Sequence, residues 1–517
     1  MSTTLQRLGL FAAICALSAA HIAGAGDLRV VNAAQNKDRE GVRSLLMQRA
    51  DANAAQADGA TALAWAAYHD DLEMAELLIA AGAKVNAANE YGITPLWLAC
   101  ANASGPMVEK LLKRRADANS AQWSGATPLM MCARTGSTAA VKSLLAREAK
   151  ANAAERKHGQ TALMWAASKS HPQVVQALIE GGAAVNASTK GGTTALMIAA
   201  QQGDIESARL LLAAGANINA VTNSHATWAG DTPLLLAAAS GHEAMAVFLL
   251  EKGADANAAD EFGFTALHFS MMESLVQVTG VRLGYPAGIF WSTYIYRDNM
   301  PGLVKALLAS GANPNARIEK YMGGNKLLST RLNDPSKFSV SEVGATPFLL
   351  AAHGHDTTIM RMLKEAGADP QLATDGRTTP LMMAAGLTRT RDLGALPYTP
   401  EQANQALETV KLCVEFGADV DAANNVGLTA LHGAAFGGLD EVIRFLVQKG
   451  ANVNAKDASG QTPLHKAMAI KPAIGMNTLK NGHSIFVPFT YWKSTSELLL
   501  QLGATPVESR VAARDGP

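Results

Sequence analysis

The chain has no excess of charge of either sign and few aromatic side chains. Its 44 Lys and Arg residues balance its 44 Asp and Glu residues, charged residues make up only 17% of the sequence, and aromatic residues make up 5%. A neutral chain lacks the basic surface that nucleic acids and anionic membranes attract. The sequence therefore predicts neither of these as a partner.

Cysteine is also sparse. Beyond the first 25 residues the chain keeps only Cys100, Cys132 and Cys413, and no Cys-x-x-Cys pair occurs. An odd number leaves at least one thiol unpaired. All three stand where an internal repeat places small buried residues, so we expect them in the core.

The sequence has no recognisable catalytic or cofactor motif. It lacks a Gly-x-x-x-x-Gly-Lys-(Ser/Thr) phosphate loop, a His-Glu-x-x-His zinc motif and a Gly-x-Ser-x-Gly nucleophile turn. His353, His355 and Asp356 lie close together, but their spacing matches no standard set of metal ligands. We therefore predict no catalytic residue, no metal site and no cofactor, and expect the protein not to be an enzyme.

Residues 1–25 resemble an export signal. Arg7 precedes an apolar run from Leu8 to about Ala20, and Ala23-Gly24-Ala25 follows as a small-x-small cleavage site. The run is shorter than the roughly 20 residues that a membrane-spanning helix needs. We predict a cleaved signal peptide, with an uncleaved anchor as the alternative.

A repeat of 33 or 34 residues organises the rest of the chain. Its mark is Gly-x-Thr-(Ala/Pro)-Leu, followed by an Ala-rich stretch, a Leu/Val-rich stretch and an ending near Gly-Ala-(Asp/Asn)-x-Asn. The eleven copies begin at residues 59, 92, 125, 159, 192, 230, 263, 344, 376, 427 and 460, the ninth being one residue longer. Such a period is typical of a solenoid whose units bury their apolar faces only by stacking.

Each conserved element of the repeat predicts a local structure. Thr429 caps the first helix of its unit, and Leu431 points into the core. Gly450 ends the second helix in a left-handed conformation. Gly427 turns the preceding chain in a β-hairpin, called a finger. One unit is thus helix, turn, helix and finger.

These motifs resemble the ankyrin repeat family, whose signature is Thr-Pro-Leu-His-x-Ala. The signature stands nearly whole as TALHGA at 429–434 and TPLHKA at 462–467. The resemblance covers about residues 27–506 and implies an all-α solenoid of about twelve repeats with β-hairpin fingers. It also implies that His268, His432 and His465 bond to neighbouring backbone.

The spacing of the motifs predicts the domain organisation. Insertions of 25, 17 and 20 residues follow Thr265, Thr379 and Thr462, all between the two helices of their units, and two fingers are extended. We predict the following parts: 1–25 signal peptide, 26–58 capping repeat, 59–262 repeats, 263–343 a repeat with an aromatic insertion and an extended finger, 344–506 repeats of which two carry insertions, and 507–517 a tail.

Three units lack the glycine that should end the second helix. Arg49, Arg115 and Glu148 stand there instead. A side chain forced into the left-handed conformation costs roughly 1–2 kcal/mol. We therefore predict that the N-terminal third of the chain opens first.

Two of the insertions concentrate the aromatic residues. Nine of the 28 aromatic residues fall in 285–296 and 486–492. They either pack back on the solenoid or form a partner surface, because exposed aromatic side chains anchor interfaces. The candidate residues are Tyr285, Phe290, Trp291, Tyr294, Tyr296, Phe486, Phe489, Tyr491 and Trp492.

A second candidate surface comes from the resemblance. Ankyrin proteins generally bind partners in a concave groove, through the finger tips and the end of the first helix. At those positions the chain has Tyr68, Tyr91, Trp123, His158, Trp228, Phe262, Phe264 and Phe436. Several of these could instead stack along the fingers and stiffen the array.

The sequence thus predicts a non-enzymatic scaffold that binds a protein partner as a monomer. We expect this scaffold to be a secreted protein of bacterial type that is located in the periplasm or outside the cell. One alternative is a hydrolase or small-ligand-binding protein whose site the insertions build around Thr265–Thr346. Another is a secreted effector that engages the proteins of a foreign cell.

Overall fold

The computed structural model describes residues 27–223, 229–271, 298–320, 343–387, 398–468 and 492–506. The chain divides into two compact units, here called unit 1 (Met1–Ala226) and unit 2 (Thr227–Pro517). Across the described ranges the secondary structure is helical, and β structure is limited to isolated antiparallel bridges such as Ala55 with Thr61. The predicted signal peptide and tail lie outside these ranges.

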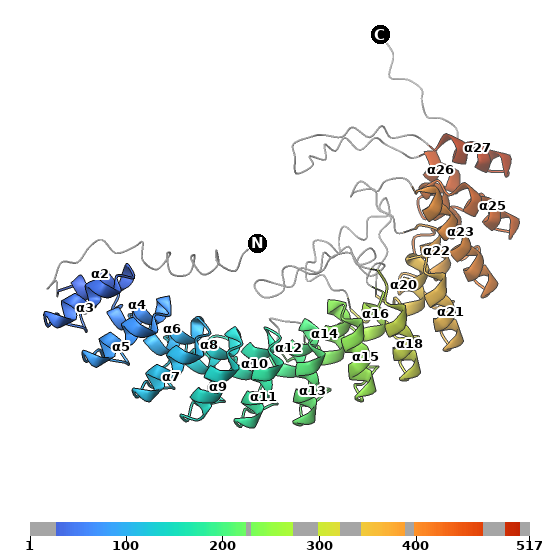
Figure 1. Ribbon diagram of the computed structural model, residues 1–517. Coiled ribbons are helices and arrows are strands. Elements are labelled where there is room, and N and C mark those ends of the chain that lie inside the picture. The colour runs from blue at the N-terminus through green and yellow to red at the C-terminus, as the bar shows by residue number, and fades with distance from the viewer. Residues whose placement is uncertain are drawn as a thin grey trace, which may run out of the picture. The chain divides into compact units, whose positions relative to one another are not determined.

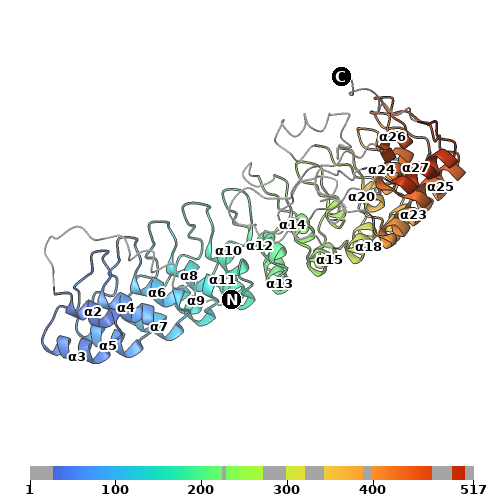
Figure 2. The same cartoon turned by 90° about the horizontal axis from the view of Figure 1, so that it is seen from above.

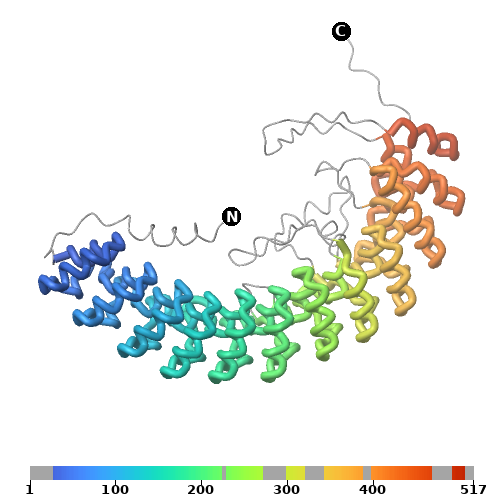
Figure 3. The backbone as a smooth tube through the Cα atoms, in the orientation of Figure 1, coloured from blue at the N-terminus to red at the C-terminus, as the bar shows by residue number. Residues whose placement is uncertain are grey.

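Unit 1 stacks helical pairs in two rows (Figures 1 and 3). In each repeat the first helix packs on the first helix of the next repeat, and the second helices form a row alongside. The first helices are α2 (Arg29–Gln35), α4 (Ala62–His69), α6 (Pro95–Ala101), α8 (Pro128–Thr135), α10 (Ala162–Ala167) and α12 (Ala195–Gln202). The second helices are α3 (Arg39–Met47), α5 (Leu72–Ala80), α7 (Gly105–Lys113), α9 (Thr138–Leu145), α11 (Pro172–Glu180) and α13 (Ile205–Ala213).

Unit 2 repeats the same arrangement. Its first helices are α14 (Pro233–Ser240), α16 (Ala266–Phe269), α20 (Pro347–His353), α22 (Pro380–Ala384), α24 (Ala430–Gly437) and α26 (Pro463–Met468). Its second helices are α15 (Glu243–Glu251), α18 (Pro301–Ala309), α21 (Thr357–Glu365), α23 (Pro400–Glu415), α25 (Asp440–Gln448) and α27 (Lys493–Gln501). Each unit thus consists of pairs that bury their apolar faces against neighbouring pairs.

The threonine of the repeat caps the first helix, as predicted. Thr94 Oγ1 accepts from the backbone N–H of Trp97 at 3.2 Å, and Pro95 occupies the first helical turn, where no donor is lost. In α24 the ring of His432 adds a second cap, because its Nδ1 accepts from the N–H of Thr429 at 3.1 Å. His268 and His465 bond to the N–H groups of Thr265 and Thr462 in the same way, which confirms the predicted structural role of these histidines.

The second helices end in left-handed residues, also as predicted. Gly450 has φ +97°, and nothing lies within 4 Å of the place where a Cβ would stand. Arg49, Arg115 and Glu148 adopt the same conformation with φ +61°, +64° and +60°. These three residues therefore carry the backbone strain that the sequence predicts.

A side-chain clamp joins consecutive repeats. Asn186 donates from Nδ2 to the carbonyl of Gly215 at 2.9 Å, and its Oδ1 accepts from the N–H of Asn217 at 2.8 Å. Asn454 makes the same pair of bonds to Gly503 and Thr505. The last asparagine of the Gly-Ala-(Asp/Asn)-x-Asn motif thus satisfies a helix-ending carbonyl of the next repeat.

The units with insertions differ from the others in their helices. The first helices α16 and α22 have four and five residues, compared with eight in α14, so the chain leaves each helix early. The prediction that the second insertion lies entirely between the two helices is wrong, because part of it lengthens the second helix: α23 has 16 residues, compared with nine in α21. Thr399, Pro400 and Gln402 form a capping box that starts this helix about two turns early.

Candidate interaction surface

Each finger is shaped by a side chain at its base. Asn89 Oδ1 accepts from the N–H groups of Tyr91 and Ile93 at 3.1 and 2.9 Å, which closes the loop. Gly92 follows the tip with φ +78°, and a Cβ there would lie 3.0 Å from the Cα of Gln122. Glycine is needed at this position both for its conformation and because the next finger lies against it.

Backbone hydrogen bonds join the fingers of unit 1 to one another. The N–H of Trp123 donates to the carbonyl of Tyr91 at 3.2 Å, and the N–H of Arg156 donates to Ser124 at 2.8 Å. The N–H of Lys190 continues the series to the carbonyl of His158 at 2.9 Å. The finger loops of unit 1 project to one side of its helices (Figure 2). Their tips are therefore held in fixed relative positions before any partner arrives.

Trp123 is the most exposed of the predicted aromatic residues within the described ranges. It lies at a finger tip with 68% of its surface exposed. Tyr91, on the preceding finger, is half-buried, and so is Tyr68 at the end of α4. The ring of Tyr68 meets the ring of Trp65 edge-on, with centroids 5.6 Å apart. Trp123 and Tyr91 thus lie together at the tips, whereas Tyr68 packs against an aromatic neighbour.

The prediction that Phe264 belongs to a partner-binding surface is wrong. This side chain is fully buried and stacks on Phe269, with ring centroids 5.7 Å apart. It occupies the x of Gly-x-Thr, which points into the stack, and Ala60 and Ala126 are likewise buried at that position. Phe262, two residues earlier, is half-buried at the tip of the same finger.

Phe436 and Trp492 lie together in unit 2. The indole N–H of Trp492 donates to the carbonyl of Phe436 at 3.1 Å, and a Cβ on Gly438 would come within 2.7 Å of the Trp492 ring. Both side chains are half-buried. For Trp492 this arrangement corresponds to the packing alternative, since its ring covers the end of α24.

The other predicted aromatic residues lie outside the described residues. They are Tyr285, Phe290, Trp291, Tyr294, Tyr296, Phe486, Phe489, Tyr491 and Trp228. For them the partner surface and the packing role both stay predictions.

Of the basic side chains on the finger tips beside Trp123, only His158 was identified from the sequence. Arg156, Lys157 and His158 occupy the next tip, Lys190 occupies the one after it, and all four are exposed. Glu155 is buried beneath them and accepts from the N–H groups of Lys157, His158 and Gln160 at 2.7, 2.6 and 3.1 Å. Burial opposes ionisation of Glu155, but these hydrogen bonds outweigh it and lower its pKa. The sequence could have indicated these side chains, because this finger has one residue more than the preceding finger.

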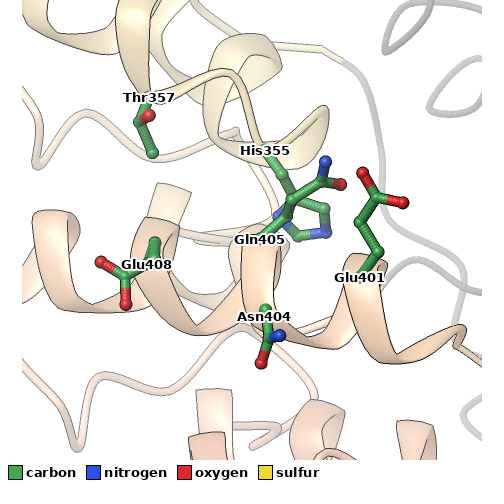
Figure 4. Close-up of a pocket in the computed structure, with 6 residues that line it drawn as sticks. All are labelled: His355, Thr357, Glu401, Asn404, Gln405 and Glu408. Atoms are coloured by element: carbon green, nitrogen blue, oxygen red, sulfur yellow. The ribbon is translucent and has the colours of Figure 1, made fainter.

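A pocket of about 530 Å³ lies between the start of α21 and the extended part of α23 (Figure 4). Its lining consists of His355, Thr357, Glu401, Asn404, Gln405 and Glu408. The sequence could have indicated it through the capping box at Thr399. Glu408 is engaged by Lys411 Nζ at 2.7 Å. In the described part of the chain no group of three His, Cys, Asp or Glu side chains could hold a metal ion.

The cysteines are buried, as predicted, and two of them form a bond that the sequence left open. Cys100 in α6 and Cys132 in α8 are joined by a disulfide. Cys413 is a buried free thiol, and burial raises its pKa to about 12. Little of this thiol is therefore ionised at neutral pH.

The chain belongs to the ankyrin repeat family. The family model for three ankyrin copies matches residues 30–122, 103–189, 129–222 and 401–472, and a model for many copies matches 196–250 and 234–274. Ankyrin repeats are in general protein-interaction modules and typically not enzymes. No helix among the described residues is both long and apolar enough to span a membrane.

Curated relatives match over a short stretch. A segment of 39 residues is 54% identical to Notch-regulated ankyrin repeat-containing protein A of Danio rerio, and equally to the Homo sapiens protein of that name without the suffix. The match covers 8% of this chain and 35% and 34% of those proteins, so the chain spans about a third of their length. The solved ankyrin repeat domain of Bcl-3, a member of the IkappaB family, is 27% identical, with a TM-score of 0.36, over 41% of this chain and 95% of that one.

Proposed function

We propose that this protein is an exported, non-enzymatic scaffold that binds a protein partner through its fingers and first helices. The observation that carries the proposal is Trp123, a large side chain that is 68% exposed at a finger tip. Tryptophan is enriched among the residues that dominate binding energy, and the finger of Trp123 lies against the finger that carries Tyr91.

The backbone hydrogen bonds between neighbouring fingers support this function energetically. The tips that carry Tyr91, Trp123 and Arg156 are linked by backbone hydrogen bonds of 2.8 to 3.2 Å. Because these bonds hold the tips in place in the free protein, little ordering entropy is lost on docking. The aromatic insertions at 281–297 and 484–493 add contacts that give selectivity.

Export has two independent supports. Residues 1–25 have the pattern of a signal peptide, and the disulfide between Cys100 and Cys132 is of the kind that persists in oxidising compartments. A bacterial periplasm or the exterior of the cell fits both. If the protein is instead a secreted effector, it has the same function, but its partner lies on another cell.

An affinity pull-down from extracytoplasmic extract of the source organism tests the proposal. Three baits are compared: the parent protein, Trp123→Ser, and a variant with Gly/Ser linkers in place of 281–297 and 484–493, all checked for folding by circular dichroism. We expect a partner held by the parent and released by at least one variant. Capture by no bait, or turnover of a small ligand at a pocket formed by the insertions, would contradict it.

A further inference from the structure

The basic side chains of unit 1 lean along the fingers toward Trp123. Arg156 Nη1 donates to the carbonyl of Trp123 at 2.9 Å, and Lys190 Nζ donates to the carbonyl of Arg156 at 2.6 Å. Their stems lie over glycines: a Cβ on Gly125 would be 3.0 Å from Arg156 Cγ, and one on Gly159 would be 3.5 Å from Lys190 Cγ. The cationic groups thus form a short run that begins at the exposed tryptophan.

This run is not neutralised by acidic neighbours. Among the described residues no ion pair involves Arg156, Lys157 or Lys190. The carboxylate of Glu155 is buried and occupied by backbone N–H groups. Carbonyl oxygens engage one donor each of Arg156 and Lys190, which leaves further donors of both groups for a ligand.

The basic character is local. On the other side of Trp123 the tips carry Asp58 and Glu90, and the carboxylate of Glu90 accepts from the hydroxyl of Tyr91. In unit 2 one described tip carries Glu261 and another carries Asp375 together with Arg377, and Asp375 is paired with Arg317 at 3.1 Å. The described finger tips of unit 1 therefore present an aromatic and basic strip, defined here as Trp123, Arg156, Lys157, His158 and Lys190.

We infer that this strip is the docking site for an extended acidic segment of the partner protein. An apolar side chain of the segment packs on Trp123, and its Asp or Glu carboxylates lie along Arg156, Lys157 and Lys190. The inference rests on the proposed function and names the chemistry of the partner. Arg156 matters most, because its guanidinium presents several fixed donors to a carboxylate.

A nucleic acid fits the strip less well than an acidic peptide. Proteins that hold a duplex commonly neutralise about 6 to 10 phosphates. The strip offers three permanent cations over the buried Glu155, and its neighbours Asp58 and Glu90 would repel a longer polyanion. A peptide of a few alternating acidic and apolar residues matches its length and its charge.

Selection from a displayed library of random 12-residue peptides on the full-length chain tests the inference. Peptides that survive are synthesised with a fluorophore, and their affinities are measured by anisotropy at 0.05 and 0.3 M salt. The variants are Trp123→Ser and Lys157→Glu/Lys190→Glu. The matched control is Lys142→Glu/Lys150→Glu, which changes the net charge equally at two exposed lysines away from the finger tips.

We expect acidic peptides with an apolar residue. Trp123→Ser should weaken them about thirtyfold, as loss of an interface anchor does. The charge reversal should weaken them at least tenfold more than the control, and added salt should weaken them further.

Three results would overturn the inference: no selected peptide, peptides without an acidic pattern, or equal binding by the reversal and control variants. A partner still captured in the pull-down would then leave the proposed function standing. Tighter binding of a single-stranded 20-nucleotide DNA than of the peptides, with the same loss in the reversal variant, would replace the peptide by a nucleic acid.

Discussion

Cys100 and Cys132 join the first helices of two consecutive repeats by a disulfide, and these are two of the repeats that lack a glycine at the end of the second helix. Arg115 ends the second helix of the repeat that contains Cys100, and Glu148 ends the second helix of the repeat that contains Cys132. The covalent link thus joins two repeats that each end their second helix with a strained left-handed residue. It offsets a local weakness, and it does so only where the disulfide can form.

Replacing both cysteines by alanine should therefore destabilise unit 1 selectively. Alanine already stands at both positions in most other repeats, so packing changes little. A cross-link that closes a loop of this length contributes about 3 to 4 kcal/mol. We expect Cys100→Ala/Cys132→Ala to lower the opening free energy of α6 and α8 in hydrogen exchange, while α24 and α25 are unchanged.

Cys413→Ala is the control for this experiment, since it removes a buried thiol from unit 2 without removing a cross-link. Equal exchange in α6 and α8 with and without the disulfide would show that the bond adds no stability. The disulfide itself is checked in cells by alkylating thiols before and after reduction. A fully alkylated chain would place the protein in a reducing compartment and contradict export.

The strain at Arg115 and Glu148 predicts a gain of stability on substitution by glycine. Each change removes a left-handed side chain that costs roughly 1–2 kcal/mol, less the 0.5–1 kcal/mol that glycine loses in entropy. We expect Arg115→Gly and Glu148→Gly to stabilise unit 1 by about 0.5–1 kcal/mol each, measured by urea unfolding. Gly182→Ala is the reciprocal control, because a Cβ there meets nothing within 4 Å and only the backbone is strained.

Hydrogen exchange across the chain tests the related expectation that the N-terminal third opens first. The disulfide makes this expectation conditional. In the Cys100→Ala/Cys132→Ala variant α2 to α9 should exchange fastest, whereas in the oxidised parent α6 and α8 should be better protected than α2 and α4. Slowest exchange in the first four repeats of this alanine variant would refute the prediction.

The asparagine clamps predict an unequal cost of truncation. Asn186 makes two hydrogen bonds to the next repeat, whereas Gln371, at the equivalent position, makes one, to the carbonyl of Gly417 at 3.2 Å. Loss of a bonded pair leaves a backbone carbonyl and an N–H to be satisfied by water and costs about 1–2 kcal/mol. Asn186→Ala should therefore destabilise its unit more than Gln371→Ala does, as measured by urea unfolding. Equal effects would mean that water replaces the clamp at no cost.

Much of this fold could be predicted from the sequence because the repeat specifies it locally. Thr94 caps a helix and Arg115 takes a left-handed conformation because of residues within a few positions of each. The disulfide between Cys100 and Cys132 could not be predicted in this way. It depends on how the two helices that carry these cysteines, 32 residues apart in the sequence, face each other. Repeats of 33 residues place these positions on facing helices, which becomes apparent only once the stack is known.

The candidate site was predicted less well, for a related reason. Residue type identifies an aromatic side chain, but its exposure depends on the position in the repeat. Phe264 and Trp123 are both finger residues, yet one points into the stack and the other away from it. Trp123 and His158 of the strip were predicted, but the charges of Arg156, Lys157 and Lys190 were missed because they belong to two different fingers, which backbone hydrogen bonds bring side by side.

Two buried acids in unit 2 give stability a predictable pH dependence. Asp231 and Asp260 are 5% and 7% exposed. Burial, followed by the charges of Asp260 and Glu261, raises the pKa of Asp231 to about 8. Burial also raises the pKa of Asp260 to about 6, although the N–H groups of Phe264 and Phe262 oppose it. Both carboxyls therefore bind protons more tightly in the folded state than in the unfolded state, where the pKa is about 3.9.

The sign of the effect follows from this difference in proton binding. The contribution of these acids to stability is fully present below about pH 4 and is lost as pH rises through about 6 and about 8. Asp231→Asn keeps the shape and removes the charge, so we expect it to stabilise unit 2 at pH 8.5, by on the order of a few kcal/mol. The difference from the parent should shrink toward pH 5, as measured by urea unfolding across that range.

Asp457 provides the control with the opposite sign. It is also buried, but its carboxylate lies 2.7 Å from Lys466 Nζ. Burial alone would raise the pKa of Asp457, yet the hydrogen bonds from Lys466 and from the backbone lower it. Asp457→Asn should therefore destabilise unit 2 at pH 7, because it leaves the buried Lys466 without its counter-ion. If Asp231→Asn were equally destabilising at pH 8.5, the raised pKa of Asp231 would be wrong.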